Sequence, residues 1–272
     1  MNHVAYIQRP NRPLRMYALL YLAFLYIPVL FLPLFSFNDS IYIAFPLRGF
    51  TTKWYAAMLD NQPMFAALMN SIKVGAASAV FATILGIFGA KAVTRYRFPG
   101  QKPVVFVIML PLVIPAIILG VALLILVSRL GITLSLYTVT LGHIVITIPF
   151  AMATLIPRFL GFDKSIEEAS ADLGENAWWT FWRVTFPIVF PGVLASLLLC
   201  FTISFDEFII AFFLAGTDPT LPIFIFGQLR FPIKLPGVLA LGACILVGSF
   251  VVVFFSQWLG RRGVEIKTAG GE

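Results

Sequence analysis

This chain of 272 residues has acidic side chains at two places where their position and spacing suggest a functional role. The first place is Asp206-Glu207, which lies within a long apolar stretch and is flanked by Phe205 and Phe208. Because acids in such stretches usually face a bundle interior or a water-filled cavity, one of them could hold a cationic amine by charge pairing and cation–π contact. Adjacent helical residues diverge by about 100°, so the two are not expected to face one solute. The alternative is that both carboxylates are simply hydrated at an interface with water.

The second place is the stretch from residue 158 to 186, which contains five of the twelve acidic residues: Asp163, Glu167, Glu168, Asp172 and Glu175. Ser165 with Glu168 forms an S-x-x-E pattern, which predicts a capping box and a short helix beginning near Ile166. Gly174 is placed to end that helix in the left-handed conformation.

A second short helix is predicted directly after Gly174. Asn176 can cap its N-terminus, and the helix then carries Trp178, Trp179 and Trp182 before Pro187. Trp178 and Trp182 are four residues apart and should share one helix face. The pattern indicates a compact helix–glycine–helix unit, and the alternative is an ordinary interfacial loop with a belt of tryptophans.

Other residues that could do chemistry do not form a convincing constellation. His143 has no acidic partner in its own apolar stretch, so we expect a hydrogen-bonded packing residue rather than a proton carrier. Cys200 and Cys244 lie within apolar runs and are expected to act as small buried hydrophobes rather than as a disulfide or metal ligands. An intramembrane protease would need a Ser–His pair and a G-x-S-x-G elbow, which the sequence lacks. We therefore predict no catalytic residue and no metal site.

The elements that position these residues follow from the composition of the chain. It is 60% hydrophobic and 11% charged, with a mean hydropathy of +0.96. Soluble domains are about 45–50% apolar and about 25% charged, so a soluble enzyme, a disordered protein and a secreted disulfide scaffold are excluded. A β-barrel would show short alternating segments rather than these long apolar runs. The composition predicts an all-α integral membrane protein.

Six segments are long and apolar enough to cross a bilayer: about 16–37, 70–92, 104–128, 135–157, 187–213 and 237–259. The first follows three arginines, but it is longer than the apolar region of a signal peptide and has no cleavage site, so we expect a retained helix. With the N-terminus in the cytoplasm, thirteen of the nineteen Lys and Arg residues fall in cytoplasmic loops and tails. This asymmetry predicts that both termini are cytoplasmic. Because it accounts for much of the net charge of +7, a nucleic-acid partner has no independent support.

The acidic loop resembles the EAA loop of ABC importer permeases. The family pattern is E-A-A, three residues, G, nine residues and then I-x-L-P, and this chain has Glu168-Ala169-Ser170, Gly174 and Val184-Thr185-Phe186-Pro187 at the same spacing. Three substitutions, all mild, depart from the pattern: Ser170 for Ala, Val184 for Ile and Phe186 for Leu. The resemblance covers roughly residues 66–258.

The resemblance implies a type I ABC importer permease fold, with residues 66–258 as a five-helix core and 158–186 as its cytoplasmic coupling loop. Residues 1–65 would be an N-terminal tail, a peripheral first helix and an external loop, and 259–272 a cytoplasmic tail. The coupling loop would enter a cleft of an ATPase subunit through residues of the first short helix: Glu167, Glu168, Ala169, Ser170, Asp172, Leu173 and Gly174.

The same resemblance implies the partners and the location. They are a cytoplasmic ABC ATPase dimer, a second homologous permease, an extracytoplasmic solute-binding protein and the lipid of a bacterial inner membrane, which the chain would cross several times. The chain has no G-x-x-x-x-G-K-[ST] loop, so ATP and Mg²⁺ would be bound by the ATPase subunit and the chain itself would need no cofactor.

The wider chain is similar to spermidine/putrescine-type permeases. The stretches that carry this similarity are FTISFDEF at 201–208, the following AGTDPTLPIFIFGQLR, and PGVLALGACILVG. The solute would then be a small cationic amine, with Asp206 or Glu207 and their phenylalanine neighbours on its path. Importers of opines or amino-acid derivatives share much of this pattern and remain the alternative. A secondary transporter would predict inverted repeats, or broken helices with ionisable groups near the membrane midplane, and neither pattern is evident.

Overall fold

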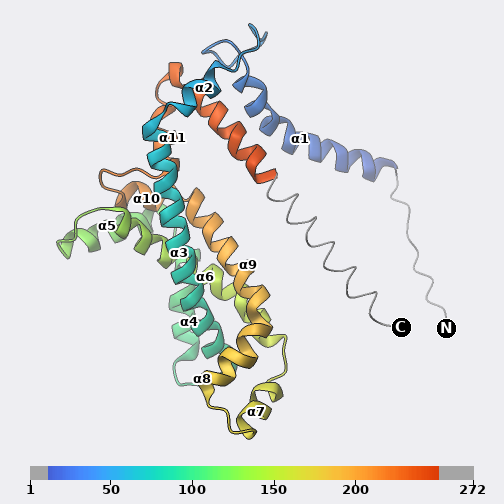
Figure 1. Ribbon diagram of the computed structural model, residues 1–272, viewed down its shortest axis with the longest axis vertical. Helices are drawn as coiled ribbons and strands as arrows, with labels where there is room; N and C mark the ends of the chain where they lie inside the picture. Colours follow the sequence, from blue (N-terminus) through green and yellow to red (C-terminus); the bar gives the residue numbers. More distant parts are fainter. Residues whose placement is uncertain (1–11, 251–272) are drawn as a thin grey trace. The chain divides into compact units, whose positions relative to one another are not determined.

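The computed structural model describes residues 12–250, and these residues are helical apart from loops and one isolated bridge between Asn38 and Phe50. The chain divides into two compact units. Figure 1 labels their helices. Unit 1 comprises the described residues before Gln62 and from Gln228 onward, and unit 2 comprises Gln62–Gly227. The predicted all-α class is confirmed for the described part of the chain.

Unit 1 contains α1 (Arg12–Ser36), α2 (Lys53–Leu59), the short η3 (Pro232–Lys234) and the helix that continues from η3 to Phe250. The loop between α1 and α2 is organised around the buried Asn38. The Asn38 carbonyl oxygen accepts a hydrogen bond from the Trp54 indole at 2.9 Å, and its side-chain oxygen accepts one from the Arg48 backbone N–H at 3.0 Å. The loop is therefore a folded segment with its own polar centre.

Unit 2 is built on three long helices that pack on one another: α3 (Gln62–Arg95), α6 (Leu136–Leu160) and α9 (Phe186–Asp206). Small residues allow the close approach, since a Cβ atom at Gly86 would lie 2.6 Å from that of Ala151. The shorter elements of the unit are α4 (Gln101–Met109), η1 (Leu110–Leu112), α5 (Ala116–Arg129), α7 (Ser165–Asp172), α8 (Ala177–Thr180), the π-helical turn η2 (Phe181–Thr185), α10 (Ile209–Leu214) and α11 (Leu221–Gln228).

Within the described residues, five helices are long and apolar enough to cross a membrane, and a bent helix pair makes up to six spans. The third predicted span, 104–128, is a bent pair of helices, because Gln101–Leu112 and Ala116–Arg129 meet at 105°. Pro111 and Pro115 flank this break, and a proline lacks the N–H that would continue the helix. Broken helices are therefore present, although the stretch between the two prolines carries no ionisable residue.

The fifth predicted span, 187–213, is wrong at both ends, because the spanning helix extends over Ala177–Asp206. Helix α9 ends at Asp206 because Glu207 adopts an extended conformation with ψ of 119°, and α10 begins separately at Ile209. The described part of the sixth span reaches Phe250; its last residues, 251–259, the predicted tail 259–272, and Arg9 lie outside the described residues. The side of the membrane on which each end lies stays a prediction.

Both cysteines are free thiols. Cys200 is buried between α3, α6 and α9, as expected for a small hydrophobe. Cys244, in contrast, is exposed, so the prediction that it is buried is wrong.

Candidate functional site

The first short helix of the acidic loop, α7, begins at Ser165, one residue before the predicted Ile166, and its N-terminus is stabilised differently from the prediction. No side chain of the Ser165–Glu168 pair forms a capping box. Instead the Asp163 carboxylate accepts a hydrogen bond from the Ser165 backbone N–H at 2.9 Å. This hydrogen bond holds the pKa of Asp163 below its usual value. The capping-box prediction is wrong because Lys164 already has helical dihedral angles, which moves the start of the helix toward Asp163.

The end of α7 and the start of α8 follow the sequence prediction. Gly174 has φ of +90°, and its N–H bonds to the Ala171 carbonyl while the Glu175 N–H bonds to that of Ser170. These two bonds form a Schellman motif, which needs a left-handed residue such as glycine. The Asn176 side chain then accepts hydrogen bonds from the N–H groups of Trp178 and Trp179. Local residues thus set the left-handed turn and the start of α8. The prediction of a second short helix is wrong, because α8 continues through η2 into α9 as one helix over Ala177–Asp206.

Glu167 connects this loop to the helical bundle. Its Oε2 atom lies 2.7 Å from Nε of Arg95, the last residue of α3, and its Oε1 atom accepts a hydrogen bond from the Thr185 hydroxyl at 2.5 Å. The pair is largely removed from water, since the Arg95 and Glu167 side chains are only 8% and 13% exposed. Arg95 also stacks on the Phe162 ring and donates to the Phe162 carbonyl. Glu167 therefore joins α7 to α3 and η2 at once.

Sequence reasoning missed Arg95 and Thr185. Thr185 stands at the variable position of the quoted Val184-Thr185-Phe186-Pro187 stretch, so the motif gave no role to its side chain. Arg95 is 72 residues before Glu167, and only the packing of α3 beside the loop brings the two charges together. Ser170, which replaces the second alanine of the pattern, has a role of its own, because its hydroxyl lies 3.0 Å from that of Thr180 and links α7 to α8.

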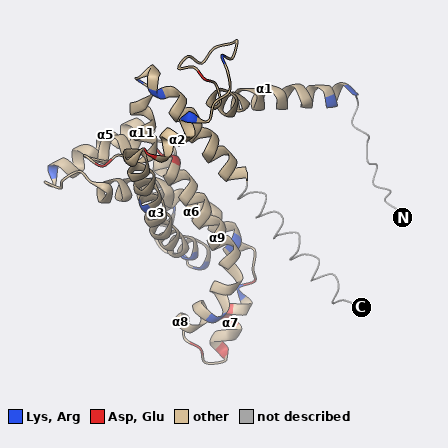
Figure 2. Ribbon diagram, turned by 45° about the horizontal axis from the view of Figure 1, so that its top comes forward, with Lys and Arg blue, Asp and Glu red and all other residues tan. Residues whose placement is uncertain are grey.

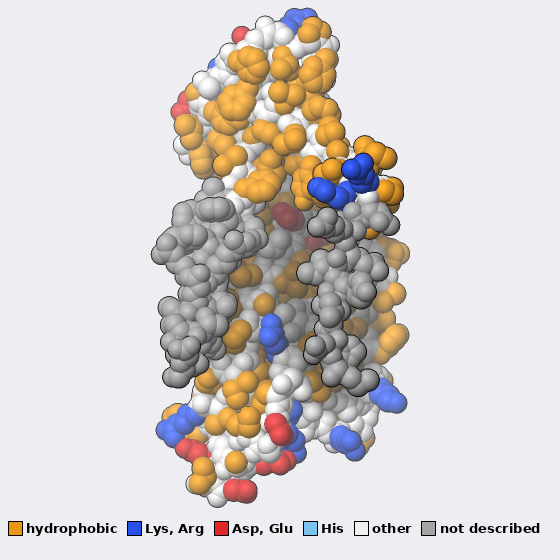
Figure 3. All heavy atoms as spheres, turned by 90° about the vertical axis from the view of Figure 1, so that its right-hand side faces the viewer, with side chains coloured by type: hydrophobic (Ala, Val, Ile, Leu, Met, Phe, Trp, Pro, Cys, Tyr) orange, Lys and Arg blue, Asp and Glu red, His pale blue; other side chains and the backbone are white. Residues whose placement is uncertain are grey.

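The other face of α7 is open. Ile166, Ala169 and Leu173 recur at helical spacing and are exposed, with Leu173 87% exposed. Glu168 pairs with Lys164 at 2.8 Å on the surface, and Asp172 and Gly174 are exposed as well. Acidic and basic residues are frequent around α7 and α8 (Figure 2), and the space-filling view shows red and blue side chains beside hydrophobic ones at this end of unit 2 (Figure 3). Of the predicted coupling residues, Glu167 and Ser170 face the protein and the other five are exposed.

The structure separates the two acids at the far end of α9, which is about 30 Å long at 1.5 Å per residue over its 21 residues. Glu207 points into the protein and accepts hydrogen bonds from the first N–H groups of α10, those of Ile209, Ile210 and Ala211, at 2.8 to 3.2 Å. These donors satisfy its charge. Glu207 is therefore a structural acid that fixes the break between α9 and α10.

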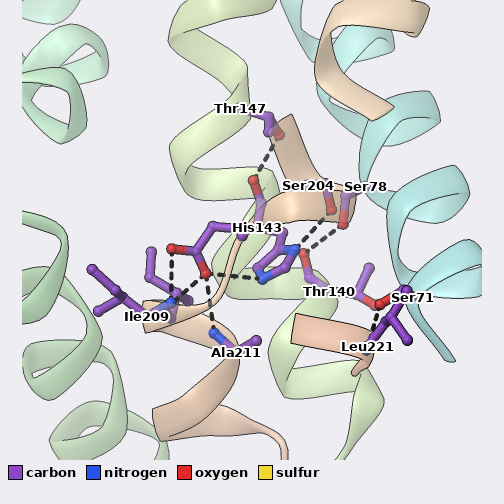
Figure 4. Close-up of polar contacts among 11 residues, drawn as sticks. Ser71, Ser78, Thr140, His143, Thr147, Ser204, Ile209, Ala211 and Leu221 are labelled. Carbon is purple, nitrogen blue, oxygen red and sulfur yellow. Dashed lines mark hydrogen bonds and ion pairs between the residues drawn. The ribbon is translucent and has the colours of Figure 1, made fainter. Parts of the chain in front are cut away.

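His143 of α6 lies next to Ser204 of α9 and is completely buried (Figure 4). Its Nδ1 atom is 2.7 Å from the Ser204 hydroxyl, and its Nε2 atom is 3.5 Å from Oε2 of Glu207. Thr147, one turn later, donates to the His143 carbonyl at 2.6 Å. The prediction that His143 is a hydrogen-bonded packing residue is confirmed. Its acidic neighbour, Glu207, lies outside α6.

Asp206 is different, since its side chain is exposed and accepts no hydrogen bond from the residues that the structure describes. It is the last residue of α9, where the partial negative charge of the helix end disfavours an anion and favours a nearby cation. Phe208, two residues after Asp206, packs with Phe212 and Phe226 at ring-centroid distances of 5.5 and 4.9 Å. Phe205 instead stacks on Phe201. The geometry thus leaves Asp206 as the carboxylate available to a cationic group.

A first prediction tests the structural role of Glu207. The variant Glu207→Ala should lose about 1–3 kcal/mol of stability, because it leaves the α10 N–H groups without their acceptor. Glu207→Gln should lose less, since its amide oxygen can still accept. Thermal unfolding of the detergent-solubilised chain measures both, and an unchanged Tm for Glu207→Ala would contradict the assignment.

The chain is similar to a known protein family and to proteins with known roles. The family model described as "binding-protein-dependent transport system inner membrane component" matches residues 82–263. The chain is 35% identical over 251 residues to the spermidine/putrescine transport system permease protein PotC of Shigella flexneri, covering 92% of this chain and 94% of that protein. It is 33% identical over 266 residues to the putrescine transport system permease protein PotI of Escherichia coli strain K12, covering 95% and 93%.

A solved structure has a similar fold. It is a bacterial alginate ABC transporter in complex with an alginate pentasaccharide-bound periplasmic protein, one chain of which superposes with a TM-score of 0.69. The two chains are 18% identical, and the superposition covers 91% of this chain and 94% of that one.

Proposed function

The chain belongs to the family of binding-protein-dependent transport system inner membrane components, and from that premise we propose that it forms half of the path by which a bacterial importer takes up a polyamine. As a member, it is a permease subunit of an ABC importer that works with a binding protein. The intramembrane-protease and secondary-transporter alternatives are thereby set aside.

The solute that we propose is spermidine or putrescine, for which the relatives PotC and PotI are named. The observation that carries the proposal is Asp206: an exposed carboxylate without a donor, at a helix end that favours cations, next to the aromatic cluster of Phe208, Phe212 and Phe226. A polyamine offers several ammonium groups separated by methylene segments, so it can pair with the carboxylate and contact the rings. Glu207 supports the path indirectly by fixing the turn that presents Asp206.

The α7 helix is the proposed contact with an ATPase dimer. Its exposed stripe of Ile166, Ala169 and Leu173 would enter a cleft of that subunit, while Glu167 transmits the movement to α3 through Arg95 and to η2 through Thr185. This arrangement has α7 in the cytoplasm, both chain termini on the same side, and a second homologous permease completing the pathway. Residues 66–258 form the five-helix core in this proposal, preceded by the peripheral first helix and followed by the tail from 259.

Reconstitution tests the proposed solute. The chain is placed in vesicles with its second permease, its ATPase subunit and its binding protein, and ATP hydrolysis is measured with a panel of solutes. We expect spermidine or putrescine to stimulate hydrolysis severalfold over the solute-free rate. Stimulation by an opine or an amino-acid derivative, without any by the two polyamines, would transfer the assignment to that alternative, and stimulation by neutral sugars alone would contradict a cationic solute.

A further inference from the structure

A second surface of unit 2, separate from the exposed stripe of α7, has features that the transport function leaves unexplained. It is a groove of about 370 Å³ between the end of α3 and the α8–η2 segment. One wall of the groove contains Phe88 and Lys91 of α3 and Tyr96, which directly follows α3. The opposite wall contains Trp178, Phe181 and Trp182 of the α8–η2 segment. Five of these six side chains are aromatic, so the groove is apolar along most of its length.

The aromatic side of the groove is ordered by its own contacts. The Trp182 ring lies 5.2 Å from that of Phe181 and 5.7 Å from that of Trp178, both in edge-on geometry. Phe181 in turn carries the Lys91 ammonium 4.8 Å above its ring. Phe181 and Trp182 lie three and four positions after Trp178 along the α8–η2 segment, so all three share the helix face that lines the groove.

Lys91 gives the groove its charge. Lys91 also lines a neighbouring groove, whose other charged residues are Arg95, Lys164, Glu167, Glu168 and Glu175. Each of these carboxylates has another basic partner: Glu167 pairs with Arg95 at 2.7 Å, Glu168 with Lys164 at 2.8 Å and Glu175 with Arg183 at 2.5 Å. Lys91 has no carboxylate partner among the described residues, and its ammonium group lies over the face of the Phe181 ring. One uncompensated positive charge therefore stands where the two grooves meet.

An apolar slot with tryptophans at its rim and one cation at the end of a spanning helix fits the chemistry of an anionic phospholipid. Tryptophan rings favour the level of the lipid headgroups, and a lysine there attracts an anionic headgroup about fivefold over a neutral one. The long stem of Lys91 can lie on apolar surface while its ammonium reaches the phosphate. A soluble anion would gain nothing from the aromatic walls.

We propose that this groove, lined by Phe88, Lys91, Trp178 and Trp182, is a binding site for an anionic phospholipid, with the phosphate on Lys91 and an acyl chain against the aromatic walls. The bound lipid contacts α3 on one side and the α8–η2 segment on the other. It thereby fills the space between the bundle and the loop that Glu167 also joins. The site depends on the chain spanning a membrane and not on the identity of the transported solute.

The test compares lipid binding by the full chain and two variants. The purified chain is incubated with an equimolar mixture of phosphatidylglycerol and phosphatidylcholine, and native mass spectrometry counts the lipids that remain bound. We expect phosphatidylglycerol to be retained about fivefold over phosphatidylcholine, with the preference lost in Lys91→Gln and kept in Lys91→Arg. Lys102→Gln is the matched control, because Lys102 is exposed, lies outside the groove and carries the same charge.

A second measurement locates the lipid. In vesicles, brominated phosphatidylglycerol should quench tryptophan fluorescence more than brominated phosphatidylcholine, and replacing Trp178 and Trp182 with phenylalanine should remove the difference. Equal retention of the two lipids, or an equal loss in Lys102→Gln, would reduce the effect to general surface charge and overturn the proposal. Displacement by glycerol phosphate alone would make the ligand a soluble phosphate, and quenching by neither lipid would mean that protein covers the groove; either result also overturns it.

Discussion

Replacing Asp206 with asparagine is expected to reduce polyamine uptake at least tenfold while the chain still folds and inserts. The side chain accepts no hydrogen bond from the described residues, so its removal leaves no buried donor unsatisfied. What the variant loses is one charge at the point where an ammonium group would pass. A loss of about 1.4 kcal/mol in that interaction is already a factor of ten.

The measurement is uptake of radiolabelled spermidine by vesicles that contain the assembled importer. The matched control is Asp218→Asn, because Asp218 is also exposed, follows α10 closely in sequence and undergoes the same change of charge. We expect this control to keep most of the uptake. Equal uptake by Asp206→Asn and the unaltered chain would remove Asp206 from the path, and equal losses in both variants would point to the general potential of that surface instead.

The second large effect is expected at the ion pair between Arg95 and Glu167. Glu167→Ala should cost about 3 kcal/mol, because it leaves the guanidinium of Arg95 largely buried without its partner. It also removes the acceptor of the Thr185 hydroxyl, so α7 loses its polar connections to α3 and to η2 together. In the assembled importer we expect ATP hydrolysis to continue with severalfold less solute moved per ATP.

Glu168→Ala is the matched control for stability. Glu168 is the next residue of α7 and also forms an ion pair, with Lys164, but this pair is more than half exposed on both sides. Pairs of this kind contribute about 0.3–0.5 kcal/mol, so the Tm should barely change. The double variant Arg95→Ala/Glu167→Ala should lose less than the sum of the two single changes, because it removes both charges of one contact. Equal Tm changes for Glu167→Ala and Glu168→Ala would show that the buried pair has no special role.

The two acids that are adjacent in the sequence show how far local reasoning reaches. Asp206 and Glu207 have the same charge and the same apolar surroundings in the sequence, and helical geometry predicted only that they point in different directions. The break after α9, at Glu207, determines which of the two acids faces the protein and which is exposed. Glu207 turns toward the N–H groups of α10 and toward His143, and Asp206 stays outside.

The sequence by itself determined the membrane class, the approximate position of the spans and the local form of the acidic loop. Hydropathy depends on composition within a window of about 20 residues, and the left-handed Gly174 and the cap by Asn176 depend on neighbours a few positions away. The spacing from Glu168 to Pro187 was likewise enough to indicate the family that the comparisons then established.

Only the tertiary structure decided which polar groups meet. Arg95 reaches Glu167 across 72 residues because α3 ends beside the loop, and His143 reaches Ser204 because α6 and α9 pack on each other. It also placed the bend at Pro111 and Pro115, which hydropathy reads as one continuous span. The physical reason is the same in each case: a charge or a break is stabilised by partners from another helix, and a local pattern contains no record of them.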